Sequence, residues 1–183
     1  MKKILLLFVS YFALFVSSSY SQSSPEEGQL TVEEFLKVTT SKLSEISRLL
    51  RNKGFSPANM KDEGDDIITI CWTYNCTYNE KDNDFSFIRF FSKPAWIRFK
   101  YDKQGFVFFL EYSYLNNTQI HSVFEAFNNE LEKYGYEIYE EEIVLENNTF
   151  STKFHNNKTN TVIELLEYYS RKNFFSIFWI KLY

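Results

Sequence analysis

The chain has 183 residues, of which 20% are aromatic, and it contains 20 phenylalanines and 13 tyrosines but only five glycines and three prolines. This balance argues against disorder, because large rings supply the burial that offsets the entropy of ordering, and the length suits one domain. The formal net charge of −4 argues against a nucleic-acid partner, because binding a phosphate backbone needs clustered Lys and Arg.

Residues 1–21 have the three-part layout of a secretory signal peptide. Lys2 and Lys3 form a basic start, residues 4–16 are an almost unbroken apolar run, and small serines follow. An uncleaved membrane anchor is the alternative, but this run is shorter than the ~20 apolar residues of a membrane span. We therefore expect a periplasmic or secreted bacterial protein with no stable membrane span after cleavage. The remaining chain carries 18 basic and 24 acidic residues.

A first helix is predicted after a short flexible leader, residues 22–30. Thr31 and Glu34 form a capping box, in which each side chain accepts a hydrogen bond from the other residue's backbone N–H. Gly54 is expected to end the helix in a left-handed conformation, within a Schellman motif. The apolar residues between these signals recur at helical spacing: Val32, Phe35, Leu36, Leu43, Ile46 and Leu50.

A second helix is predicted to end in the same way. The stretch "LRNKGF" at Leu50 to Phe55 is echoed by "LEKYGY" at Leu131 to Tyr136, 81 positions later. In both stretches a leucine would pack on the ring that follows the glycine. The echo indicates either one structural unit built twice or two ordinary helices with an ordinary cap. The apolar stripe of this helix is Ile120, Val123, Phe124, Phe127, Leu131 and Tyr134.

Each predicted helix is followed by about four runs rich in β-branched and aromatic residues, which indicate strands. The runs cover residues 66–75, 85–91, 95–101, 106–115, 136–145, 149–155, 161–169 and 174–183. We therefore predict that residues 31–183 form a single α+β domain of two helix-plus-four-strand halves, 31–115 and 116–183, with an antiparallel sheet and helices packed on one face. This element order is similar to that of secreted bacterial inhibitor proteins of the β-lactamase-inhibitory type, which pair two helix-plus-sheet modules.

The two cysteines, Cys71 and Cys76, raise the question of a disulfide, because an exported chain with an even cysteine count often forms one. In an extended strand their odd spacing points the two side chains to opposite faces. A bond therefore requires the chain to turn at residues 73–75, since the two Cα atoms must lie within ~7 Å. The alternative is a pair of small, partly buried free thiols.

Catalytic and metal-binding motifs are not evident in the sequence. It contains no nucleophile elbow, no glycine-rich phosphate loop and no paired-cysteine zinc motif. The acidic stretches at residues 62–66, 82–84 and 140–142 are interpreted as solvated loops or edge-strand charge, with calcium binding as the alternative. We therefore expect neither a cofactor nor a metal.

Many rings without a catalytic constellation favour a non-catalytic binding or protein-interaction module. Its site would lie on the sheet face or in the groove between the halves, and its partner would be a protein or a small apolar ligand. The alternative is a hydrolase or other enzyme, with a site assembled from His121, His155, Glu164 and the acidic loops. The candidate binding contacts are Trp72, Trp96, Tyr112, Tyr114 and Trp179.

Overall fold

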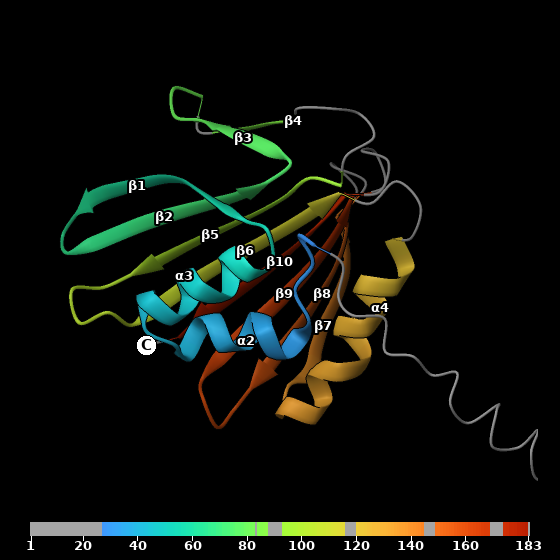
Figure 1. The fold of residues 1–183 in the computed structure, drawn as a ribbon. Coiled ribbons are helices and arrows are strands. Elements are labelled where there is room, and N and C mark those ends of the chain that lie inside the picture. The colour runs from blue at the N-terminus through green and yellow to red at the C-terminus, as the bar shows by residue number, and fades with distance from the viewer. Residues whose placement is uncertain are drawn as a thin grey trace, which may run out of the picture.

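The computed structural model describes residues 27–82, 84–87, 93–115, 120–144, 149–168 and 174–182. Within these ranges the chain forms an eight-stranded antiparallel sheet, a separate two-stranded sheet and three short α-helices (Figure 1). The expected α+β class with an antiparallel sheet is confirmed. The predicted signal peptide, residues 1–21, lies outside the described residues.

The large sheet has the order β1-β2-β5-β6-β10-β9-β8-β7, so β6 and β10 pair at its centre and β1 and β7 are its edges. Charged residues such as Glu140 and Glu141 lie on the β7 edge, where they discourage pairing with another chain. The strands are β1 (Ser56–Gly64), β2 (Ile67–Tyr74), β5 (Ala95–Tyr101), β6 (Val107–Leu115), β7 (Glu137–Val144), β8 (Thr149–Asn156), β9 (Thr161–Tyr168) and β10 (Phe174–Lys181).

In the N-terminal half, the strand predictions need correction at two places, β1 and the run at residues 85–91. Sequence analysis missed β1, "SPANMKDEG", because its proline, glycine and charges are typical of a turn. An edge strand tolerates them, since one side of its backbone faces solvent. The run predicted at residues 85–91 is described only in part, and that part lies in β4 (Asp84–Phe87). β4 pairs with β3 (Cys76–Asn79) as a small hairpin apart from the large sheet.

The predicted first helix is two helices, α2 (Val32–Thr40) and α3 (Leu43–Asn52). The capping box at Thr31 is confirmed, with both reciprocal hydrogen bonds present. The prediction of one continuous helix is wrong, because two hydroxyl side chains near the break bond back to the backbone: Thr39 to the Leu36 carbonyl at 2.7 Å and Thr40 to the Lys37 carbonyl at 3.4 Å. Such bonds compete with helix continuation, and Ser41 is extended.

Both predicted glycine caps are confirmed. The N–H of Phe55 donates to the Leu50 carbonyl at 3.0 Å, and the N–H of Tyr136 donates to the Leu131 carbonyl at 3.2 Å. The intervening glycines, 54 and 135, both have a φ near +80°, the left-handed region that suits a residue without Cβ. The second cap follows α4 (Ile120–Glu130) and a short 3₁₀ helix, η1 (Leu131–Tyr134).

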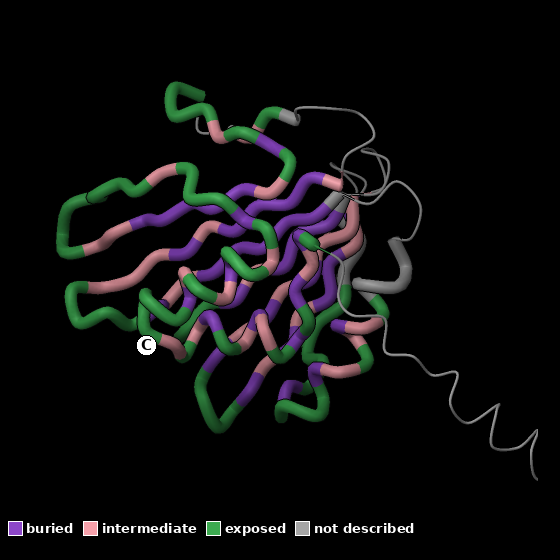
Figure 2. The backbone as a smooth tube through the Cα atoms, in the orientation of Figure 1, coloured by how far each residue is buried: buried purple, intermediate pink, exposed green. Residues whose placement is uncertain are grey.

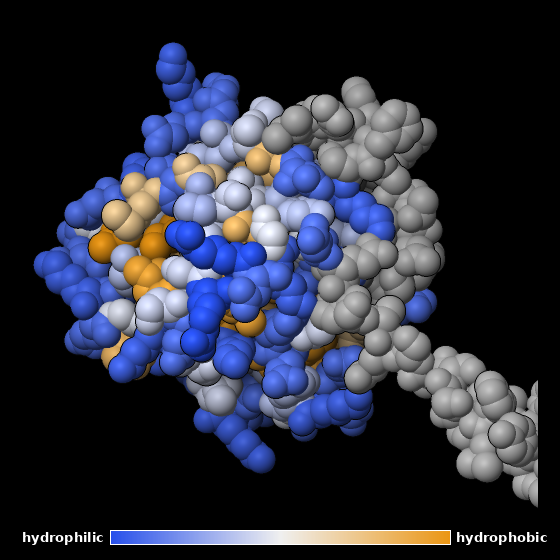
Figure 3. All heavy atoms as spheres, in the orientation of Figure 1, coloured by the Kyte–Doolittle hydropathy of each residue, from blue (hydrophilic) through white to orange (hydrophobic). Residues whose placement is uncertain are grey.

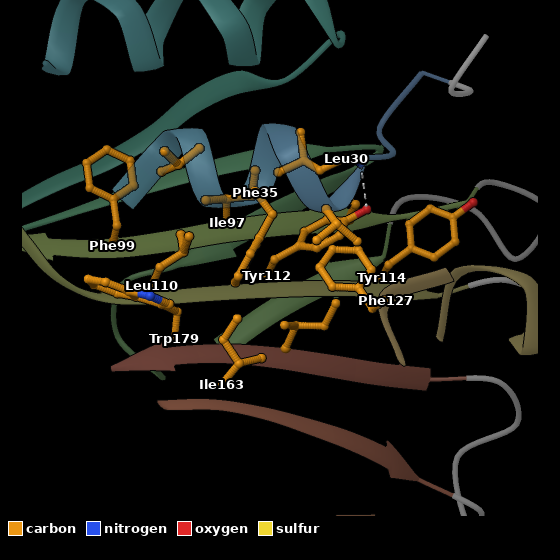
Figure 4. Close-up of a cluster of buried hydrophobic side chains, with 14 of the residues drawn as sticks. Leu30, Phe35, Ile97, Phe99, Leu110, Tyr112, Tyr114, Phe127, Ile163 and Trp179 are labelled. Carbon is orange, nitrogen blue, oxygen red and sulfur yellow. Dashed lines mark hydrogen bonds between the residues drawn. The ribbon is translucent and has the colours of Figure 1, made fainter. Parts of the chain in front are cut away.

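The core lies between the helices and the sheet. Phe35 of α2 contacts Tyr112 of β6 at a ring-centre distance of 6.5 Å and Phe127 of α4 at 5.5 Å, the latter edge-to-face. Figure 4 shows these rings with Ile97 and Leu110 of the central strands beneath α2. The central strands are buried along most of their length, whereas β1 is exposed along most of its own (Figure 2).

The other face of the sheet carries a polar network. Glu111 of β6 accepts hydrogen bonds from Arg98 at 2.8 Å and from the Trp96 indole at 3.1 Å. The β3–β4 hairpin reaches this face, where Phe85 stacks on Trp96 with ring centres 4.5 Å apart. The hairpin therefore covers part of a face that would otherwise expose a tryptophan.

Candidate functional site

Two of the predicted contact residues, Tyr112 and Tyr114, are fully buried in the core. The Tyr112 hydroxyl accepts from the Leu30 N–H and donates to the Gly28 carbonyl, both at 3.2 Å. The amide of Gln29 donates to the Tyr114 hydroxyl at 2.6 Å. Desolvation is the main cause of a raised pKa for Tyr112, which therefore stays neutral. These phenols anchor residues 28–30, the end of the expected leader.

Trp72 and Trp96, two further predicted contacts, are also buried. The Trp72 ring lies beneath the guanidinium of Arg51, which is 5.9 Å from the ring centre. Trp96 lies between the Glu111 carboxylate and the Phe85 ring. Both indoles therefore pack against other side chains of the protein. The remaining predicted contact, Trp179, lines a groove.

This aromatic groove has a volume of about 540 Å³ and lies where the end of α2, the β5–β6 turn, η1 and the β8–β9 turn meet. Trp179, Tyr136 and Val107 are buried at its floor. At its rim the side chains of Phe106 and Tyr134 are 60% and 39% exposed. A groove of this size with buried and exposed rings suits a small molecule.

The polar atoms at the floor of the aromatic groove bond one another. The Trp179 indole donates to the Tyr136 hydroxyl at 3.1 Å, and that hydroxyl pairs with the Thr161 hydroxyl at 2.9 Å. The Thr161 hydroxyl also pairs with that of Thr159 at 2.7 Å. A linked network fixes the orientation of the rings, so the floor is organised before any ligand arrives.

The lining of the aromatic groove carries hydroxyls and one cation, Lys181, but no carboxylate among the residues that the structure describes. The Lys181 Nζ lies 6.0 Å from the centre of the Phe106 ring, within cation–π range. Chemically, the groove offers ring faces, neutral hydrogen-bonding groups and one positive charge. It is therefore suited to a neutral or weakly anionic ligand that has an apolar face.

The sequence held a weak signal for this groove. Strict alternation along the strand would place Phe106 on the same face as the buried Leu110 and Tyr112. The register shifts between Lys100 and Tyr101, however, and Val107 is buried in the core while Phe106 is exposed. A bulge of this kind re-aims the side chains beside it, and periodicity alone does not locate one.

The suggested disulfide is not present: Cys71 and Cys76 are free, buried thiols. The chain does turn between them, at Asn75 with φ 55°. The Cys76 thiol points to the Ala95 carbonyl, to which it donates at 3.3 Å. Burial raises the pKa of each thiol to about 11, so both stay protonated at neutral pH.

Of the residues suggested for catalysis, His155 and Glu164 are described, and each contacts a different neighbour. The His155 ring lies 6.1 Å from that of Tyr139, and Glu164 accepts a hydrogen bond from Ser151 at 2.8 Å. The side chain of His121 lies outside the described residues. No group of three or more His, Cys, Asp or Glu side chains with metal-binding geometry occurs in the described ranges.

Comparisons with known proteins return no family model, no curated protein and no solved structure that matches this chain. Within the described part of the chain, no helix combines the length and the apolar character needed to cross a membrane.

Proposed function

We propose that the protein is an exported, non-catalytic binding protein whose ligand lies in the aromatic groove. The observation that carries this proposal is the exposure of Phe106 and Tyr134 at the rim, above the buried floor of Trp179. Large exposed rings are costly in water unless a ligand covers them, because burying apolar area releases about 25 cal/mol per Å². The two rings come from separate elements, the β5–β6 turn and η1, so one ligand can contact both.

The ligand class follows from the lining of the aromatic groove. Rings favour an apolar or ring-shaped molecule, and the hydroxyls of Thr40 and Ser41 provide neutral hydrogen-bonding partners at the rim. Lys181 favours a ligand with partial or full negative charge at one end. We therefore propose a small amphipathic molecule, with a ring face and polar substituents, as the ligand.

We also propose that the domain consists of two related halves, 31–115 and 116–183, with the aromatic groove between them. The strand order of the large sheet supports this idea. From one edge to the centre the strands are β1, β2, β5 and β6, and from the other edge they are β7, β8, β9 and β10, so each half places its four strands in chain order from edge to centre. The matching glycine caps that end α3 and η1 support it as well. Superposing the Cα atoms of the two four-strand series tests the proposal, and a fit that leaves Leu50 and Leu131 apart would contradict it.

Export is the part of the proposal that rests on residues 1–21 alone. Expression of the full chain in a bacterial host should yield, outside the cytoplasm, a protein that begins after Ser19 or Ser21. Intact-mass measurement of the recovered protein checks this. Recovery of an uncleaved chain in the membrane fraction would contradict it.

Binding in the aromatic groove can be tested with the fluorescent probe 8-anilinonaphthalene-1-sulfonate, which has rings and one negative charge. The folded protein should enhance its emission with saturation. Phe106→Ala and Tyr134→Ala should each weaken binding by roughly tenfold, the expected effect of losing one ring contact together with its buried area. Neither variant should change the unfolding free energy by more than about 0.5 kcal/mol, because both side chains are exposed.

Tyr139→Ala is the matched control, since Tyr139 is 54% exposed on β7 and is not among the residues that line the aromatic groove. It should leave probe binding unchanged. Equal loss of binding in the control and in the two groove variants would show that the probe reports general surface exposure. Unchanged binding in both groove variants would refute the assignment of the groove.

A further inference from the structure

A second pocket lies on the sheet face that carries Arg98 and Glu111, beneath the β3–β4 hairpin. This hairpin pocket has a volume of about 540 Å³, and β1, β2, β3 and β5 contribute its walls. It has no lining residue in common with the aromatic groove. Its chemistry is also different, because charged side chains take the place of rings.

The strand register places two lysines on either side of one threonine in the hairpin pocket. Lys61 of β1 is the cross-strand partner of Thr69 of β2, and Thr69 is in turn the partner of Lys100 of β5. Directly opposite residues in an antiparallel sheet project from the same face. Thr69 therefore lies between Lys61 and Lys100 on the sheet face that lines the pocket.

Thr69 is an independent observation that points to a ligand in the pocket. The residue is only 7% exposed, and its hydroxyl has no hydrogen-bond partner. Buried side-chain hydroxyls are nearly always bonded, and an unbonded one calls for an explanation such as an absent ligand. The pKa of Glu63 is lowered chiefly by the hydrogen bond from Lys61, with smaller contributions from Thr69 and Lys100.

The charges around the pocket leave one cation available. Lys61 pairs with Glu63 at 2.8 Å, and Arg98 pairs with Glu111 at 2.5 Å. Lys100 forms no ion pair with any residue that the structure describes, and its Nζ lies 5.8 Å from the centre of the Phe109 ring. The Glu63 and Glu80 carboxylates also line the pocket and would repel a negative group. A negative group is therefore expected to bind at Lys100 and Thr69.

We propose that the hairpin pocket is a second binding site, for a small organic acid whose carboxylate or phosphate contacts the Lys100 ammonium and the Thr69 hydroxyl. An oxyanion can accept from both donors at once, and charge-assisted bonds of this kind are the strong ones. The pocket volume exceeds that of an inorganic ion, which leaves room for the rest of the molecule beneath Tyr78 of β3.

The experiment is isothermal titration of the full mature protein with benzoate, phenyl phosphate and the neutral analogue benzyl alcohol. At least one of the two anions should bind saturably, and benzyl alcohol should not. Lys100→Gln should weaken anion binding by roughly tenfold, the usual effect of losing a charged hydrogen bond. Thr69→Val should weaken it severalfold and leave the melting temperature equal or higher, because valine removes a buried hydroxyl that has no partner.

Lys133→Gln is the control for net charge, since Lys133 is an exposed lysine on η1 outside the hairpin pocket. It should leave anion binding unchanged, as should Phe106→Ala in the aromatic groove. The proposal is overturned if neither anion gives saturable heat, or if benzyl alcohol binds as tightly as benzoate. Equal affinity of wild type, Lys100→Gln and Thr69→Val would also overturn it. Because the two pockets share no residues, the outcome is independent of the proposed function.

Discussion

The indole of Trp179 donates a 3.1 Å hydrogen bond to the phenol of Tyr136, joining β10 to the residue that follows the cap of η1. Both side chains are buried, and both belong to the floor of the aromatic groove. The bond couples the rim to the core, because only Gly135 separates the buried Tyr136 from Tyr134 at the rim. The position of an exposed rim ring is thus set by a buried pair.

Tyr136→Phe should lower the unfolding free energy by about 2 kcal/mol, because it removes the acceptor and leaves the buried Trp179 N–H unpaired. Tyr134→Phe, two residues earlier and exposed, is the matched control and should change stability by less than about 0.5 kcal/mol. Urea denaturation followed by tryptophan fluorescence measures both. Equal stability of the two variants would show that the Trp179–Tyr136 bond contributes nothing.

Gly28→Ala should be far more destabilising than Gly64→Ala, although both glycines have φ near +80°. Each substitution incurs a left-handed strain of about 1–2 kcal/mol. A Cβ at Gly28 would lie 2.3 Å from the Tyr74 ring, whereas a Cβ at Gly64 meets nothing within 4 Å. Overpacking at Gly28 should therefore cost about 1–3 kcal/mol more.

Thermal and urea unfolding of the two glycine variants isolate the clash, because the strain is common to both. A similar loss of stability in Gly28→Ala and Gly64→Ala would mean that the Tyr74 ring moves aside freely, and that residues 28–30 are not packed as described.

The two free thiols should be protected in the folded protein. At neutral pH, iodoacetamide should label neither Cys71 nor Cys76 in the native state, because both are buried and burial raises each thiol pKa to about 11. In denaturant without reductant it should add two alkyl groups, as counted by mass spectrometry. No labelling under that second condition would reveal a disulfide.

The same thiols make stability depend on alkaline pH. Their ordinary pKa is 9.0, and burial raises it to about 11. Between pH 9 and 11 the unfolded chain therefore loses thiol protons that the folded chain retains. The folded state then binds more protons, so the unfolding free energy falls with rising pH from about pH 8 upward, by up to about 2 kcal/mol per thiol.

Urea titrations at pH 8 and pH 10.5 test this fall in stability. Cys71→Ala/Cys76→Ala should show a smaller decrease between the two pH values than the wild type does. Some decrease should remain in the double variant, because burial also raises the pKa of Tyr112. An identical decrease in both proteins would remove the thiols from the explanation.

Sequence patterns predicted local features well where neighbours in the chain decide them. The capping box at Thr31 and the caps at Gly54 and Gly135 depend on bonds within six residues, and all three were predicted. Central strands such as β5, "AWIRFKY", coincide with their predicted run, because alternation and aromatic content are strong there. The break between α2 and α3 was missed, because the apolar stripe continues across it.

The candidate contacts were predicted less well than the strands that carry them. Aromatic identity alone does not separate a core ring such as Tyr112, which is fully buried, from a rim ring such as Phe106. The difference depends on which elements cover each ring, and those elements are far away in the sequence. Tyr112 is covered by residues 28–30 and by Phe35, whereas Phe106 follows an exposed turn at the edge of the groove.

The sequence by itself determined the α+β class, the strands of the sheet centre and the way both helical segments end, because these follow from side-chain periodicity and short-range hydrogen bonds. Only the tertiary structure decided the strand order with β6 beside β10, the free state of the two thiols and the two pockets. Those features arise from contacts between separate elements, from 19 positions apart for the Cys76 thiol and the Ala95 carbonyl to 84 for Tyr112 and Gly28, which no local pattern encodes.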